Sequence, residues 1–179
     1  MSDAQRCAVI AVLGAPNAGK STLVNSLVGA KVAAVTQKVQ TTRALVRGVA
    51  MRGQTQLVLI DTPGVFAPKR RLDRAMVAAA WSAIEGADMI VHLVDAAAHA
   101  PGASKPGEQR AVEDAARLAE KLKQMETPAL LVLNKVDAIA RPELLAITAK
   151  LVEQGLYTDV FMVSALKGDG VEDLAKTLV

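Results

Sequence analysis

Cysteine, histidine and aromatic residues are scarce in this sequence of 179 residues. One cysteine, Cys7, excludes an internal disulfide, and two histidines, His92 and His99, leave little for a zinc site. The longest apolar run is far shorter than the ~18 residues of a membrane span, and the N-terminus lacks a signal-peptide pattern. We therefore expect a cytoplasmic protein rather than a secreted, membrane-spanning or zinc-dependent one, with Cys7 and His92 packed in its core.

Charge is also nearly balanced, with 21 Lys and Arg against 18 Asp and Glu and a net charge of +3. This excess is too small to indicate nucleic-acid binding by charge alone, and no DNA partner is expected. A hydrophobic fraction of 51% with 22% charged residues is typical of a folded globular chain rather than a disordered one. The length suits one domain.

Short apolar runs alternate with longer helical patterns along the chain. The predicted strands are 8–13, 43–51, 54–60, 88–94, 129–133 and 159–163; the predicted helices are 20–28, 72–85, 107–125, 142–154 and one from 171; a surface loop is predicted at 96–110. The short link at Arg52-Gly53 predicts an antiparallel hairpin. Because fully apolar strands alternate with helices, we expect an α/β fold: a six-stranded, mostly parallel sheet with one antiparallel strand and helices on both faces.

The most specific motif is G-A-P-N-A-G-K-S at residues 14–21, between a predicted strand and a predicted helix. Its two glycines allow a tight turn and a close approach of the backbone, whose N–H groups bind phosphate oxygens together with the positive helix end. Lys20 places a charge between the β- and γ-phosphates, and the Ser21 hydroxyl is a ligand for Mg²⁺. The predicted phosphate-binding residues here are Gly14, Ala15, Pro16, Asn17, Ala18, Gly19, Lys20, Ser21 and Thr22.

A second motif, D-T-P-G, follows the third predicted strand. Its carboxylate can reach the metal through the water shell, and its glycine N–H can contact a γ-phosphate. A threonine of the polar segment 31–43 can complete the Mg²⁺ shell; we prefer Thr42 to Thr41, with ordinary surface threonines as the alternative. The predicted phosphate contacts are Asp61, Thr62, Pro63, Gly64 and Val65, and the predicted metal ligands are Ser21, Thr42 and Asp61.

The motif N-K-V-D at residues 134–137 ends the fifth predicted strand and is expected to select the base. The Asp137 carboxylate can accept both the N1–H and the exocyclic amino group of guanine, whereas adenine would leave it unpaired, so discrimination can reach ~10⁴-fold. The Lys135 stem can lie on the base, and Asn134 can tie this loop to the phosphate loop. After the sixth strand come Ser164, Ala165 and Leu166, where the Ala165 N–H is expected to meet guanine O6.

Together these motifs resemble the bacterial Era family of GTPases, and Q-T-T-R at residues 40–43 is the most Era-like element. The resemblance implies a Ras-like fold, binding of GTP and GDP with Mg²⁺, and a role in assembly of the small (30S) ribosomal subunit. It also implies a C-terminal KH domain that binds small-subunit ribosomal RNA in the full-length protein; residues 1–179 correspond to the GTP-binding domain. Some relatives associate peripherally with the inner membrane. GTPases of the Der or MnmE type are the alternatives.

Val65 stands where Ras-like enzymes carry the glutamine that orients water. The intrinsic rate of hydrolysis, without an activating partner, is therefore expected to be on the order of 10⁻⁴ to 10⁻² s⁻¹. The expected catalytic residues are Lys20, Asn17, Thr42 and Gly64. In GTPases resembling MnmE, an asparagine at the position of Asn17 holds K⁺ beside the phosphates; the alternative is that it satisfies loop backbone groups. The alternative to an enzyme is a module that docks on RNA or the ribosome when GTP is bound, with incidental turnover.

Overall fold

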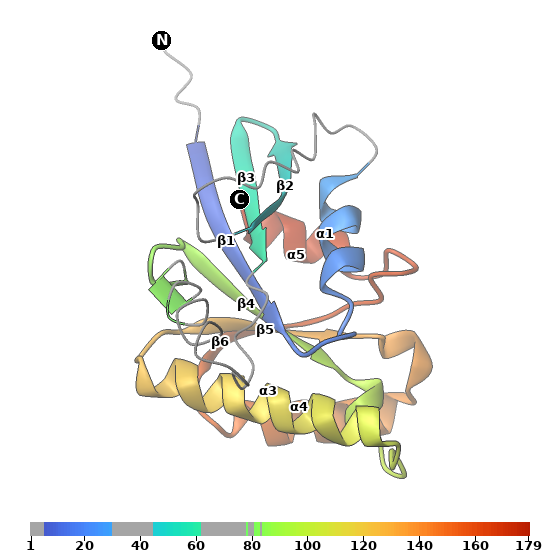
Figure 1. Cartoon of the computed structure of the whole chain (residues 1–179). Coiled ribbons are helices and arrows are strands. Elements are labelled where there is room, and N and C mark those ends of the chain that lie inside the picture. Colours follow the sequence, from blue (N-terminus) through green and yellow to red (C-terminus); the bar gives the residue numbers. More distant parts are fainter. Residues whose placement is uncertain (1–5, 30–44, 62–77, 79–80, 83) are drawn as a thin grey trace.

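The computed structural model describes residues 6–29, 45–61, 78, 81–82 and 84–179 (Figure 1). Six strands form one sheet in the order β2-β3-β1-β4-β5-β6. Their bounds are β1 Arg6–Gly14, β2 Leu45–Arg52, β3 Thr55–Asp61, β4 Met89–Asp95, β5 Ala129–Asn134 and β6 Tyr157–Met162. Only the β2–β3 pair is antiparallel within this sheet, and the other described pairs are parallel. The predicted hairpin and mixed α/β sheet are therefore confirmed.

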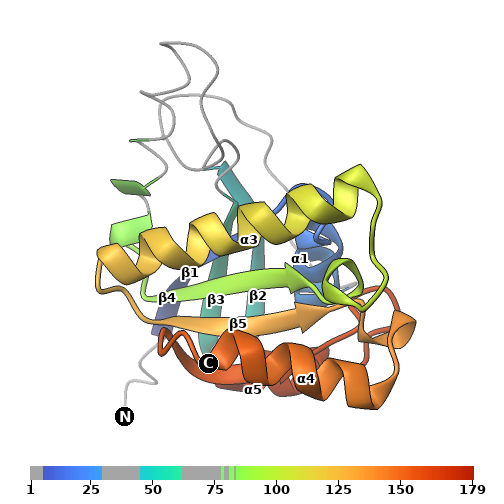
Figure 2. The same cartoon turned by 90° about the horizontal axis from the view of Figure 1, so that it is seen from below.

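Helices cover both faces of the sheet, as predicted. Their bounds are α1 Lys20–Val28, α3 Pro106–Gln124, α4 Arg141–Val152 and α5 Val171–Thr177, with 3₁₀ turns η1 Ala97–His99 and η2 Val136–Ala138. Buried residues of α1 and α5 share one apolar cluster with alternate residues of β1, whereas α3 packs with the intervening residues of β1. Figure 2 shows α3 and α5 on opposite sides of the sheet. None of the helices in the described part of the chain is long and apolar enough to cross a bilayer.

The first strand shows why burial changes along its length. Residues 10–14 are buried, because this part of β1 lies between β3 and β4 with both faces covered. Arg6 and Cys7 precede this covered stretch and are exposed. The prediction that Cys7 packs in the core is therefore wrong, because an apolar run does not reveal that pairing with β4 begins only at Ile10.

The predicted surface loop at 96–110 is also partly wrong. It contains η1, and α3 already begins at Pro106. The Glu108 side chain accepts a hydrogen bond from the Lys105 backbone N–H at 2.9 Å, which pairs one backbone donor at the start of the helix. Proline in the first turn and an acidic residue at its third position are the signals for this helix. The predicted helix 72–85 falls mostly outside the described residues.

His92 of β4 is a buried histidine, as predicted, with a side chain 1% exposed. Its Nδ1 atom shares a hydrogen bond of 2.8 Å with the Tyr157 hydroxyl, which comes from the first residue of β6. Burial, with a smaller contribution from His99, lowers the pKa of His92 from 6.5 to about 4. The folded protein therefore holds this imidazole neutral at physiological pH.

We expect His92 to make folding stability depend on pH between about 6.5 and 4. The unfolded chain binds a proton on this histidine below pH 6.5, whereas the folded chain resists protonation until about pH 4. The free energy of unfolding is therefore not lowered by His92 above pH 6.5, and it falls by about 3 kcal/mol in total as the pH is lowered to about 4. Urea unfolding of wild type and His92→Leu across this range should show a shallower pH slope in the variant; equal slopes would contradict the expectation.

Candidate functional site

The predicted phosphate and base motifs meet at one edge of the sheet. The carboxyl ends of parallel strands lie at the same edge, and in open α/β sheets this is where ligands bind. The 14–19 loop follows β1, residues 134–137 follow β5, and residues 164–166 follow β6. The spacing in sequence is large, but β1, β4, β5 and β6 are consecutive neighbours in the sheet (Figure 1).

Two glycines of the phosphate loop are required by its packing against the neighbouring strands. A Cβ on Gly14 would lie 2.6 Å from the Leu93 carbonyl oxygen of β4. Gly19 has φ 99°, and a Cβ there would overlap the Asn134 side-chain nitrogen of β5. The sequence predicts that these glycines allow the turn and the approach of phosphate. The structure adds that each leaves room for an atom of the protein itself.

Helix α1 starts within the loop and presents its positive end there. Gly19 is the N-cap, and among the described residues no side chain caps this end, which leaves first-turn N–H groups directed at the loop. Lys20 Nζ donates hydrogen bonds to the carbonyl oxygens of Gly14 at 2.7 Å and Ala15 at 3.0 Å. Its ammonium therefore lies across the loop. Ser21, the next residue, is exposed.

Asn134 joins the three motif segments through one buried amide, 2% exposed. Its Nδ2 atom donates to the Ala18 carbonyl oxygen at 2.8 Å, and its Oδ1 atom accepts from the Ala165 N–H at 3.0 Å. The tie to the phosphate loop follows the prediction. The hydrogen bond from the Ala165 N–H to Asn134 is not predicted, because this N–H is expected to meet guanine O6. To contact guanine, the N–H would have to leave Asn134 Oδ1 or share its hydrogen between the two oxygens.

Lys135 connects the base motif to two further places. It has the left-handed φ of 64°, and its Nζ atom donates to the Asn17 carbonyl oxygen at 2.8 Å and to Asp95 Oδ2 at 2.6 Å. Asn17 itself has φ 63°. Left-handed non-glycine residues are strained and cluster at functional sites. Asp95 is not singled out by the sequence motifs; the available signal is that it directly follows the predicted strand 88–94, as the motif residues follow theirs. In the structure it is the register partner of Asn134.

The Asp137 carboxylate is held by two residues of the loop after β6. A hydrogen bond from the Ser164 side chain, helped by Lys167 and opposed by partial burial, keeps the pKa of Asp137 below its ordinary value. Lys167 Nζ lies 3.4 Å from Asp137 Oδ2. The group is therefore ionised at neutral pH and accepts hydrogen bonds only, as recognition of two guanine donors requires. Lys167 was not anticipated from the sequence.

Several predicted residues lie outside the described part of the chain: Thr41, Thr42, Thr62, Pro63, Gly64 and Val65. The backbone of Asp61 is described, at the end of β3, where it pairs with Val12 of β1. This register places Asp61 beside the strand that leads into the phosphate loop. A hydroxyl and a carboxylate are hard oxygen donors, so Ser21 and Asp61 fit Mg²⁺ by their chemistry.

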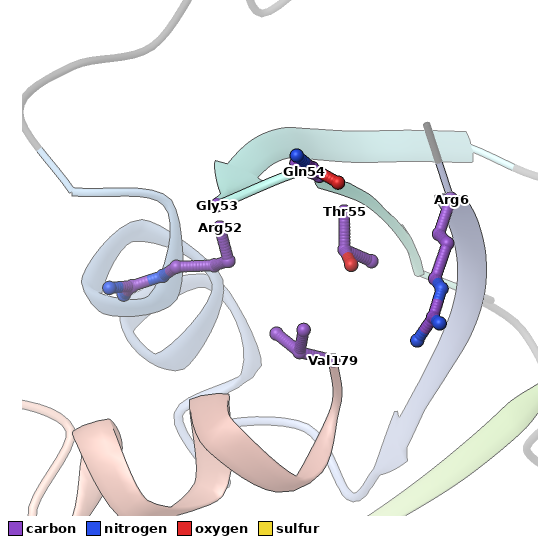
Figure 3. A pocket seen from close by; sticks show the side chains of 6 residues that line it. All are labelled: Arg6, Arg52, Gly53, Gln54, Thr55 and Val179. Carbon is purple, nitrogen blue, oxygen red and sulfur yellow. The ribbon is translucent and has the colours of Figure 1, made fainter. Parts of the chain in front are cut away.

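A separate pocket of about 480 Å³ lies at the other end of β1, around Arg6, the β2–β3 turn and Val179 (Figure 3). The Arg52 guanidinium points away from Val179: it donates to the Leu27 carbonyl oxygen at 3.1 Å and pairs with Glu172 at 3.2 Å. The pocket and the phosphate loop are thus at opposite ends of the central strand, and its residues are not part of the candidate nucleotide site.

Comparison with known proteins agrees with this geometry. The family described as 50S ribosome-binding GTPase matches residues 9–135. GTPase Era of Maricaulis maris is 60% identical over 178 residues, which are 97% of this chain and 57% of that protein. The chain thus spans a little over half of that relative's length.

Two solved Era structures have the same fold. An Aquifex aeolicus Era variant bound to GDP.AlF4- has a TM-score of 0.72, 30% identity, and coverage of 97% of this chain and 56% of that one. Era in complex with MgGDPNP and nucleotides 1506-1542 of 16S ribosomal RNA has a TM-score of 0.70, 30% identity, and coverage of 98% and 56%. The chain therefore belongs to the 50S ribosome-binding GTPase family and, within it, resembles the GTPase region of Era.

Proposed function

We propose that residues 1–179 form a GTP-binding domain that binds GTP and GDP and hydrolyses GTP slowly to GDP and phosphate. The observation that carries this proposal is the buried Asn134 amide, which joins the Ala18 carbonyl of the phosphate loop to the Ala165 N–H. One side chain thereby fixes the spacing between a phosphate-binding segment and a base-binding segment. A site built for phosphate alone would not need that connection.

In the bound state, residues 14–22 surround the phosphates, and Lys20 turns its ammonium from the loop carbonyls towards the β- and γ-phosphate oxygens. Across the site, Asp137 accepts the two guanine donors, the Lys135 stem lies on the base, and the 164–166 segment borders it. Asp61 through Val65, with the Gly64 N–H at the γ-phosphate, complete the phosphate side; this part of the proposal rests on the D-T-P-G motif.

Ser21, Asp61 and Thr42 are the proposed ligands of Mg²⁺, Asp61 through the water shell. When bound, Mg²⁺ would neutralise charge on the phosphate oxygens. Asn17, exposed on the loop, is the proposed ligand of K⁺, a further cation where charge develops. Val65 cannot orient water, which supports slow intrinsic turnover and activation by a partner.

The proposed role is a switch in small-subunit assembly, and two observations support it. GTPase Era of Maricaulis maris is 60% identical, and a solved Era structure contains nucleotides of 16S ribosomal RNA. These relatives favour Era over the Der and MnmE types, and they favour the small subunit although the family description names the 50S subunit. A C-terminal KH domain, outside the 179 residues, is the proposed main contact to RNA. Peripheral membrane association stays a prediction.

Nucleotide-dependent unfolding tests the proposal directly. With Mg²⁺ present, GDP is expected to raise the unfolding temperature of the protein, and ADP at the same concentration is expected to leave it unchanged. Equal effects of GDP, ADP and no nucleotide would overturn the proposal.

Single-turnover hydrolysis with and without 30S subunits separates an enzyme from a docking module. Hydrolysis rates that are equal in K⁺ and Na⁺ buffers would eliminate the proposed K⁺ site.

A further inference from the structure

Asp95 is the last residue of β4 and belongs to none of the sequence motifs. Its side chain is 13% exposed, and its two carboxylate oxygens have different partners. Oδ2 accepts a hydrogen bond from Lys135 Nζ at 2.6 Å, and Oδ1 accepts one from the Ala98 N–H at 3.3 Å. One oxygen of the carboxylate is therefore bonded to η1, and the other is bonded to the base motif.

The Lys135 ammonium has a second partner, the Asn17 carbonyl oxygen of the phosphate loop, at 2.8 Å. Two loops are thus joined through one charged group, and the residue at each end of that bond has a left-handed φ, 64° and 63°. Such conformations persist only where the surroundings hold them. The Asp95 side chain, 13% exposed, supplies the opposite charge to the Lys135 side chain, which is 38% exposed, and charge-assisted hydrogen bonds are stronger than neutral ones.

The frame around Asp95 is itself tied to the base motif. The Ala96 N–H donates to the Asn134 carbonyl oxygen at 3.0 Å, and His99 Nδ1 lies 3.0 Å from the Asp95 carbonyl oxygen. Asp95 and Asn134 are register partners on neighbouring parallel strands. The backbone that carries the Asp95 side chain is therefore held in place relative to the base motif.

We propose that Asp95 is a positioning residue for guanine-nucleotide binding, which acts through Lys135 and rests on the function proposed above. The carboxylate holds the Lys135 ammonium between β4 and the phosphate loop, and this sets the path of the lysine stem that covers the base. Asp95 does not touch the nucleotide. Asp95 acts on the lysine stem that covers the face of the base, and not on the carboxylate that accepts the guanine donors. It is therefore expected to alter the affinity for nucleotide but not the choice of base.

A double-mutant cycle in GDP affinity tests this assignment. Asp95→Asn keeps the shape and an acceptor for the Ala98 N–H but removes the charge, and we expect it to weaken GDP binding by about tenfold. Lys135→Met keeps an unbranched stem but removes the ammonium. In the Lys135→Met background, Asp95→Asn is expected to cause no further loss, because its partner is already gone. Inosine diphosphate, which lacks the exocyclic amino group, should lose the same factor as GDP.

Glu172→Gln is the matched control, because it also converts an ion-paired carboxylate to an amide but lies at the opposite end of the sheet, against Arg52. It is expected to leave GDP affinity unchanged. Unchanged affinity in Asp95→Asn, or an equal loss in both backgrounds, would overturn the assignment. If Asp95→Asn does not fold, Asp95→Ser, which keeps an acceptor but no charge, takes its place.

The affinity of wild type for GDP and ADP distinguishes a failure of the proposed function from a failure of the assignment of Asp95. If wild type binds GDP no better than ADP, the proposed function fails and the assignment of Asp95 fails with it. If wild type is selective for GDP and Asp95→Asn binds GDP equally well, only the assignment of Asp95 fails.

Discussion

Asp137→Asn is expected to weaken GDP binding by about 10³- to 10⁴-fold. The wild-type carboxylate offers only acceptors, and guanine presents two donors on the edge that faces it. An asparagine places an N–H₂ group against those donors and cannot satisfy both. Xanthine carries a carbonyl oxygen where guanine carries the amino group, so the same variant should gain affinity for xanthosine diphosphate. A single substitution is therefore expected to change the base that the site prefers from guanine to xanthine.

Titration calorimetry with GDP and xanthosine diphosphate measures both changes. Asp169→Asn is the matched control, because Asp169 is an exposed aspartate of the neighbouring loop after β6, and its backbone carbonyl oxygen accepts a hydrogen bond from the Ser164 N–H. It should bind GDP as wild type does. GDP binding by Asp137→Asn within about threefold of wild type would show that Asp137 does not read the base.

The sheet could be predicted because its signals are local. Residues 8–13 and 129–133 are fully apolar runs of strand length, which is typical of parallel strands covered on both faces, and the two-residue link at Arg52-Gly53 leaves room only for a hairpin. Motif positions followed from the same frame, since each comes directly after a predicted strand. The carboxyl ends of parallel strands then bring residues 14–21, 134–137 and 164–166 to one edge.

The contacts within the site were less accessible to sequence reasoning, because they depend on the register between strands. Asp95 and Lys135 are separated by 40 positions, and only the pairing of β4 with β5 brings their side chains together. Lys167 reaches Asp137 through the turn after β6 in the same way. Cys7 shows the converse case: the residues that follow it are apolar, yet it is exposed, because pairing of β1 with β4 begins only at Ile10. The local apolar pattern therefore indicates where a strand lies, whereas the register between strands decides which side chains come into contact.

Asn134→Ala is expected to lower both the stability of the fold and the affinity for nucleotide. Truncation leaves the Ala18 carbonyl oxygen and the Ala165 N–H without their bonds in a region that is almost fully buried. Each of these two unpaired buried groups costs about 1–3 kcal/mol, so the free energy of unfolding should fall by about 2–6 kcal/mol. GDP affinity should fall as well, since the phosphate loop and the 164–166 segment lose their common support.

Urea unfolding and GDP binding of Asn134→Ala can be compared with Asn25→Ala, the same change at an exposed position of α1. The control should stay within about 0.5 kcal/mol of wild type and bind GDP normally. Asn134→Asp gives a sharper test, because it retains the acceptor for the Ala165 N–H but turns an oxygen towards the Ala18 carbonyl. Two facing acceptors repel, so this variant should be no more stable than Asn134→Ala. A fully stable Asn134→Asp would show that the bond to the phosphate loop contributes nothing, and that the two halves of the site are joined by other contacts.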